Sequence, residues 1–118
     1  MSDIRVKRAY ESADKSDGAR YLVDRLWPRG VSKEKADLTD WLKSVAPSDE
    51  LRQRYHEGAL NWPNFVKAYE AELGKDEAAE GVQTLKEAAS KGRITLVFAS
   101  KQTEQNNATA LRDYLLKG

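Results

Sequence analysis

The chain has 118 residues, of which 20 are Lys or Arg and 19 are Asp or Glu, so its formal net charge at pH 7 is +1. This length predicts one domain, residues 1–118. Balanced charge argues against nucleic-acid binding, which usually needs a basic excess or stripe. The chain has no cysteine, which excludes disulfides and thiol chemistry and favours a cytoplasmic protein. No apolar run approaches the ~18 residues of a membrane span, so we expect no membrane association.

Two strands are predicted near the start of the chain. Residues 4–9 alternate apolar and basic side chains, as a strand with one solvated face does. Asp17-Gly18 marks a turn, and residues 19–26 form the second strand with a continuous apolar run. The connection between them is short for a parallel crossover, which usually takes about a dozen or more residues. The sequence therefore leaves open whether this pair is parallel or antiparallel.

Helices are predicted to fill the middle of the chain, because apolar residues recur there at helical spacing between capping and helix-ending residues. The first predicted helix covers residues 38–46, with Asp37 or Thr39 as its cap and Pro47 at its end. The second covers residues 49–57 between Ser48 and Gly58. The third covers residues 62–73 between the cap Asn61 and Gly74, and the fourth covers residues 76–91 and ends at Gly92. Each helix is expected to bury one apolar face.

A third strand and a last helix complete the chain. Residues 93–98 are apolar enough for a central strand covered on both faces, and Thr103 is predicted to cap a helix that runs to Leu115. The order β-β-α-α-α-α-β-α predicts an α/β fold, with a small, mostly parallel central sheet flanked by helices in a Rossmann-like or flavodoxin-like sandwich. Val23 and Val97 are expected on adjacent or next-nearest parallel strands, because both strands are continuously apolar.

Charged and polar residues follow the second and third strands directly. Ligands of an open α/β sheet bind beyond the carboxyl ends of its strands, and Arg side chains and helix N-termini both accept anionic groups. The sequence therefore predicts a site for a small anionic molecule at these strand ends. The expected roles are charge neutralisation for Arg25, Arg29 and Lys101, ligand orientation for Ser100 and Asn106, a pocket wall for Trp27, and positioning of Arg25 or proton acceptance for Asp24.

Structural explanations compete with this site. Asp24 and Arg25 would equally form a local ion pair that holds a loop. The consecutive amide side chains of residues 105–107 suit capping as well as a rim of hydrogen-bonding groups around a ligand. The second functional hypothesis is therefore a non-enzymatic protein-interaction module, in which the charged helices and the exposed part of Trp27 dock a partner.

The sequence indicates no reaction, no catalytic residue and no cofactor. His56 is the only histidine, and no acidic cluster has the spacing of a Mg²⁺ or Ca²⁺ site, so no tightly held metal is expected. No nucleophile can be paired with His56 from the sequence. No glycine-rich phosphate loop or dinucleotide-binding motif is present. Whether the protein is an enzyme is left open.

Residues 24–30, Asp-Arg-Leu-Trp-Pro-Arg-Gly, together with residues 16–18 ahead of them, resemble the signature of the bacterial family of domains of unknown function numbered 488, in its YeaO-like branch. Further matches are Trp41, Ala46-Pro47-Ser48, Leu51-Arg52, His56, Trp62, Phe65, Tyr69, Glu72-Leu73 and the stretch from Leu96 to Leu115. The resemblance implies a compact cytoplasmic α/β domain and no particular activity, since the family is uncharacterised. It also implies histidines in the first turn of the last helix, where this chain has Gln105 and Asn107, so any proton transfer or metal binding by those histidines would be lost here.

Overall fold

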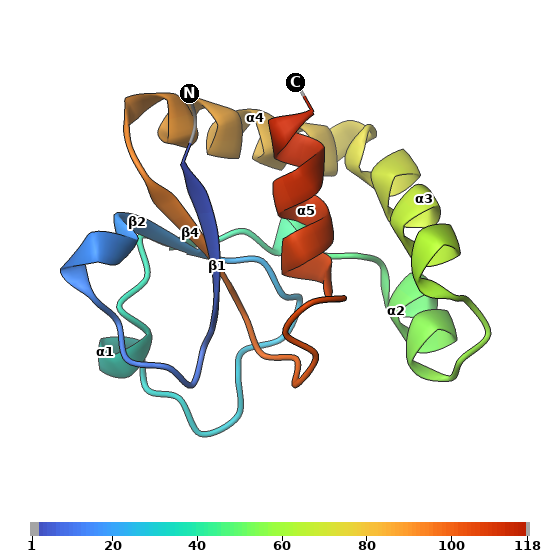
Figure 1. The fold of residues 1–118 in the computed structure, drawn as a ribbon, viewed down its shortest axis with the longest axis horizontal. Helices are drawn as coiled ribbons and strands as arrows, with labels where there is room; N and C mark the ends of the chain where they lie inside the picture. The colour runs from blue at the N-terminus through green and yellow to red at the C-terminus, as the bar shows by residue number, and fades with distance from the viewer. Residues whose placement is uncertain (1–2, 118) are drawn as a thin grey trace.

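A computed structural model describes residues 3–117 and has the predicted α/β fold. Its sheet has 4 strands, all parallel, in the order β1-β4-β2-β3 (Figure 1). The strands are β1 (Ile4–Arg8), β2 (Ala19–Leu22), β3 (Asp40–Trp41) and β4 (Ile94–Phe98). Because all of them run in the same direction, their carboxyl ends share one edge of the sheet.

The strand β4 occupies the centre of the sheet, and all of its residues are buried. Its sequence, apolar except for Thr95, suits this position, because a central parallel strand is covered on both faces. It pairs with β1 along its whole length and with β2 on its other side. The Val23 amide, one residue beyond the end of β2, donates to the Val97 carbonyl at 3.1 Å, so Val23 and Val97 lie side by side where the parallel strands β2 and β4 end, in agreement with the prediction. The first two strands are parallel to each other, with β4 between them.

The four longer helices lie on one side of the sheet around the larger core, and the last of them packs directly against the first and fourth strands. These helices are α2 (Asp49–His56), α3 (Trp62–Leu73), α4 (Asp76–Lys91) and α5 (Asn107–Leu116). Two of the predicted caps are confirmed: the Ser48 side chain accepts the Leu51 amide, and the Asn61 side chain accepts the Asn64 amide. These caps satisfy amides that have no partner inside a helix.

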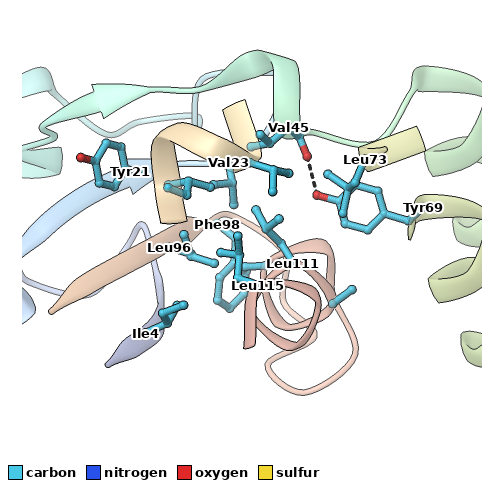
Figure 2. Close-up of a cluster of buried hydrophobic side chains, with 14 of the residues drawn as sticks. Ile4, Tyr21, Val23, Val45, Tyr69, Leu73, Leu96, Phe98, Leu111 and Leu115 are labelled. Carbon is cyan, nitrogen blue, oxygen red and sulfur yellow. Dashed lines mark hydrogen bonds between the residues drawn. The ribbon is translucent and has the colours of Figure 1, made fainter. Parts of the chain in front are cut away.

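The larger hydrophobic core lies between these helices and the sheet (Figure 2). Phe98 of β4 meets Leu111 and Leu115 of α5 there. The buried Tyr69 hydroxyl of α3 donates a hydrogen bond to the Val45 carbonyl, which ties that helix to the segment after β3. Burial raises the pKa of Tyr69, so the hydroxyl keeps its proton and remains a donor.

The opposite face of the sheet is covered by irregular chain rather than by long helices. The loop of residues 24–39 includes the one-turn helix α1 (Lys33–Ala36), and the connection between β1 and β2 includes the 3₁₀ turn η1 (Lys15–Asp17). Trp27 and Trp41 pack edge to face over this side, with ring centroids 5.4 Å apart. The smaller core beneath them consists of Ala9, Leu22, Val31, Ala36 and Val97.

The helix predicted over residues 38–46 is wrong. This segment forms the short strand β3 and the 3₁₀ turn η2 (Lys43–Val45). The Thr39 and Leu42 amides donate to carbonyls of β2 at 2.7 and 2.9 Å. Trp41 joins the smaller core, whereas Leu42 packs against the larger one. Pairing with β2 therefore outweighs helical spacing, because it buries apolar side chains on both sides of the segment.

Two predicted boundaries also need correction. The second strand ends at Leu22 and not at residue 26, and the last helix begins at Asn107 and not after Thr103. Asn106 is the capping residue: its Oδ1 accepts the Thr109 amide at 2.9 Å, and the Thr109 hydroxyl accepts the Asn106 amide at 3.1 Å. This reciprocal pair satisfies two amides at once and sets the start of the helix.

Candidate functional site

The Asp24 carboxylate joins the carboxyl ends of β2 and β4. Its Oδ2 accepts the Ala99 amide at 2.9 Å, and its Oδ1 accepts Asn107 Nδ2 at 3.0 Å. The same nitrogen of Asn107 also donates to the Val23 carbonyl at 3.0 Å. The indole nitrogen of Trp41 donates to the Asp24 carbonyl at 2.7 Å. Asp24 thus ties two strand ends to the first residue of α5.

Burial raises the pKa of Asp24 above its usual value of 3.8, although hydrogen bonds from Asn107 and Ala99 and the charge of Arg52 act in the opposite direction. The local ion pair expected between Asp24 and Arg25 is not the pairing in the structure, because Arg25 turns to Asp49. Both carboxylate oxygens of Asp24 accept hydrogen bonds within the fold. In this arrangement Asp24 is a structural acceptor.

Two guanidinium groups flank the Asp49 carboxylate at the same edge of the sheet. Arg25 Nε lies 3.7 Å from Asp49 Oδ1, and Arg52 Nη2 lies 3.3 Å from the same oxygen. The side chains of Arg25 and Asp49 are 40% and 66% exposed. Arg25 Nε itself is buried and has no hydrogen-bond partner among residues 3–117, since 3.7 Å is too long for a hydrogen bond. This edge of the sheet therefore contains one hydrogen-bond donor of a charged group, Arg25 Nε, that has no acceptor among the described residues.

Parallel pairing brings the loops after β2 and β4 to one edge of the sheet, as the predicted site required. Arg29 is exposed on the first loop, and Ser100 and Lys101 are exposed on the second. Arg8 Nε donates to the Ser100 carbonyl at 2.9 Å, which anchors the start of the second loop to the end of β1. The predicted ligand-binding roles of these three residues remain predictions.

The other two predicted site residues have partners inside the fold. Trp27 Nε1 donates to the Val31 carbonyl at 2.6 Å, and its ring closes the smaller core against Trp41. The Asn106 side chain is buried; besides capping α5, its Nδ2 donates to the Gln102 carbonyl at 2.7 Å. The polar groups of both side chains are therefore satisfied by the protein itself.

Asp49, Arg52 and Asn107 belong to this edge, although the predicted site did not include them. The spacing of Asp49 and Arg52, three residues apart on a helix, is a local signal for an ion pair. The ion pair between Asp49 and Arg25 joins α2 to the loop after β2, and no local sequence pattern predicts such a long-range contact. Asn107 was one of three consecutive amides, and only the position of α5 shows that it reaches Asp24.

A second polar cluster lies away from the strand ends, on the face with the smaller core. Asp17 is buried, and its carboxylate accepts Arg20 Nη1 at 2.6 Å and Lys7 Nζ at 3.2 Å. Burial acts to raise the pKa of Asp17, but hydrogen bonds from the Asp14 amide, Lys7 and Arg20 outweigh it and leave the pKa below 3.8. Thr95 of the central strand donates its hydroxyl to the Asp17 carbonyl at 2.7 Å. The sequence predicts only a turn at Asp17.

His56 is exposed at the end of α2. Within the described part of the chain, no three His, Cys, Asp or Glu side chains are grouped so that they could hold a metal ion. The same residues include no helix long and apolar enough to cross a bilayer.

The fold and these contacts define a small parallel α/β domain with a charged edge at its strand ends. Residues 3–118 match the family described as the inactive DUF488-N3 subclade, and the chain belongs to this DUF488 family. The chain is 43% identical over 113 residues to the uncharacterised protein YeaO of Escherichia coli K12, and the match covers 96% of each chain. It is 38% identical over 112 residues to the uncharacterised proteins Rv3073c of Mycobacterium tuberculosis H37Rv and Mb3100c of Mycobacterium bovis, covering 95% of this chain and 92% of each relative. No solved structure matches the chain.

Proposed function

We propose that this protein is a cytoplasmic, non-catalytic domain that binds a small anion at the carboxyl ends of β2 and β4. The observation that carries the proposal is the pair of guanidinium groups, Arg25 and Arg52, that approach the same oxygen of the single Asp49 carboxylate. Arginine binds carboxylate and phosphate oxygens in a fork geometry, so such a pair is suited to an anionic ligand. The absence of cysteine from the sequence supports a reducing compartment.

The charges of this edge favour a negative ligand. Arg25, Asp49 and Arg52 together carry one net positive charge, and the buried Arg25 Nε still needs an acceptor. The Tyr55 hydroxyl of α2 donates to the Gln105 carbonyl at 3.2 Å, so the helix that carries Arg52 contacts the segment that leads from Lys101 to α5. A ligand oxygen beside Arg25 would satisfy its free donor and compete with Asp49 for both guanidinium groups.

Two observations support binding without catalysis. The family description contains the word inactive. Asp24, a half-buried carboxyl group of this edge, already accepts hydrogen bonds from Ala99 and Asn107 at its two oxygens. A general base must lie within hydrogen-bond reach of the proton that it removes, whereas both oxygens of Asp24 already bond groups of the fold.

Thermal unfolding in the presence of inorganic phosphate, nucleotides, sugar phosphates and small carboxylates tests this proposal. A ligand at about 100 times its Kd adds about 2.7 kcal/mol to the free energy of unfolding. We expect at least one of these anions to raise the Tm of the wild type. Arg25→Gln and Arg52→Gln should reduce that shift, whereas Arg54→Gln, an exposed position on another side of α2, should preserve it.

Asp49→Asn provides the sharper measurement, because it removes the negative charge that competes with the ligand. It should bind the same anion more tightly than the wild type, with the shift measured against the Tm of each variant alone. If none of the anions shifts either the wild type or Asp49→Asn, the anion site does not exist.

Exposed Leu26, with 61% of its surface in solvent, favours a second candidate function, a protein-interaction module. It lies directly between Arg25 and Trp27 on the loop after β2. A module predicts that Leu26→Ser abolishes capture of one defined partner from a bacterial lysate and leaves anion binding unchanged. Capture that is insensitive to Leu26→Ser would argue against docking through this loop.

A further inference from the structure

A cleft of about 360 Å³ opens at the opposite edge of the sheet, at the amino ends of β2 and β3. Its walls come from the turn η1 on one side and from the residues between α1 and β3 on the other. The polar side chains that line it include Asp14, Lys15, Arg20, Asp37 and Thr39. Its volume lies in the range of small-molecule sites, roughly 300–1,000 Å³. The anion site proposed above lies at the other ends of the strands, so this cleft is separate from it.

Arg20 is the buried group in the wall of this cleft, and only 2% of its surface is exposed. Its Nε donates to the Ala36 carbonyl at 2.9 Å, and its Nη1 donates to Asp17 at 2.6 Å. Its Nη2 is also buried and has no hydrogen-bond partner in the described chain. Buried donors are nearly always bonded to protein, water or ligand, so this nitrogen leaves one unsatisfied donor behind the cleft wall, and a ligand oxygen reaches it once the Arg20 side chain shifts toward the cleft.

The charges that line the cleft are balanced. Lys15 and Arg20 are cationic, whereas Asp14 and Asp37 are anionic. A simple anion would be attracted by Lys15 and Arg20 but repelled by the two aspartates. A simple cation would be attracted by the aspartates and repelled by Lys15 and Arg20. A molecule with both an anionic and a cationic group would complement both pairs, because opposite charges at short range favour binding and like charges oppose it.

We propose that this cleft binds a small zwitterion of the free amino-acid class. The ligand carboxylate would accept from Arg20 Nη2 and Lys15, and its ammonium group would donate to Asp14 and Asp37. Thr39 supplies a hydroxyl group at the same wall, although its Oγ already accepts the Arg20 amide at 3.1 Å. The protein would then have a separate ligand at each edge of its sheet.

Isothermal titration of the full chain with each of the twenty common amino acids tests this inference, because it does not depend on knowing the ligand. We expect one or a few to bind. The N-acetyl and carboxamide derivatives of the best ligand should each bind about tenfold more weakly or worse, since each removes one of the two charges. Inorganic phosphate should not compete with the amino acid at this edge.

Lys15→Gln and Asp37→Asn should each weaken binding by about tenfold, because each removes one charged contact. Both positions are exposed, and Asn tolerates the left-handed backbone of Asp37, whose φ is 45°, so both variants should fold. Lys33→Gln, an exposed lysine of α1, is the matched control and should bind as the wild type does. The inference is wrong if no free amino acid binds, or if both derivatives bind as tightly as the parent amino acid. It is also wrong if Lys15→Gln and Asp37→Asn bind the amino acid as tightly as Lys33→Gln does.

Discussion

At the scale of single residues, the buried Asp17 and the half-buried Asp24 illustrate how surroundings shift the pKa of a carboxyl group. Asp17 faces Lys7 and Arg20, and these hydrogen bonds, with one from the Asp14 amide, hold its pKa below the usual value despite its burial. Asp24 is half-buried against neutral donors, and there the partial removal of its carboxyl group from water raises the pKa. Burial opposes the charged form in both cases, and only Asp17 has cationic partners in direct contact to compensate for it.

This difference predicts the pH dependence of Asp24→Asn. Between the unfolded pKa of about 3.8 and its higher folded pKa, Asp24 binds more protons in the folded state, so its contribution to stability rises as the pH falls. Asn cannot titrate, and it replaces one of two acceptor oxygens by a donor. We therefore expect the free energy of unfolding of the wild type to exceed that of Asp24→Asn by an amount that grows from pH 7 towards pH 4, measured by urea unfolding.

Because all other carboxyl groups are common to both proteins, the difference between the two curves isolates Asp24. A difference that stays constant or shrinks on acidification would show that the folded pKa of Asp24 is not raised.

At the scale of elements, α4 approaches the turn η2 through a glycine. A Cβ atom added at Gly81 would lie 2.5 Å from Val45 Cγ1 and 2.8 Å from Ser44 Oγ. Val45 is fully buried and its carbonyl accepts the Tyr69 hydroxyl, so it cannot move aside freely. The absence of a side chain at Gly81 therefore permits the close packing of this helix.

Gly81→Ala should destabilise the protein, although alanine is the better helix former. The gain in helix propensity is about 1 kcal/mol, whereas overpacking costs typically 1–3 kcal/mol, so we expect a net loss of about 1 kcal/mol. Gly74→Ala is the control, because a Cβ there meets nothing closer than 3.8 Å. Urea unfolding of both variants measures the effect, and a Gly81→Ala protein as stable as the wild type would mean that α4 moves away from η2 at little cost.

At the scale of the whole molecule, the sheet connects the two ends of the chain. Ile4 of β1 pairs with Ile94 of β4, and Tyr21 of β2 pairs with Leu96 of the same strand. No strand on either side of β4 can complete its hydrogen bonds until this late segment is in place. Such long-range pairing couples the helix-covered face of the sheet to the loop-covered face.

We therefore predict that the chain unfolds as one cooperative unit. The three tryptophans report on both faces: Trp62 packs beside Phe65 on the larger core, whereas Trp27 and Trp41 cover the smaller one. In Trp62→Phe, and separately in the double variant Trp27→Phe/Trp41→Phe, the fluorescence and far-ultraviolet circular dichroism midpoints should coincide in urea. An earlier fluorescence midpoint in Trp62→Phe would show that the loop-covered face unfolds on its own.

The sequence by itself determined the class of fold, the central strand and most helices. Four of the five residues 94–98 are apolar, and the helices after Ser48 and Asn61 have both caps and apolar stripes. Local pattern and tertiary environment therefore favour the same elements there. The sequence also placed Arg25 and Lys101 beyond neighbouring parallel strands, because polar residues follow each apolar run.

Only the tertiary structure decided the partners of these residues. It turned residues 40–41 into a strand, because β2 offers backbone hydrogen bonds that a local helix cannot match. In the tertiary structure Asp24 accepts a hydrogen bond from Asn107, and Arg25 pairs with Asp49. Arg20 is buried beside a cleft that no sequence pattern indicates. Side-chain contacts between residues far apart in the chain depend on how the elements pack, and periodicity and capping describe only neighbours along the chain.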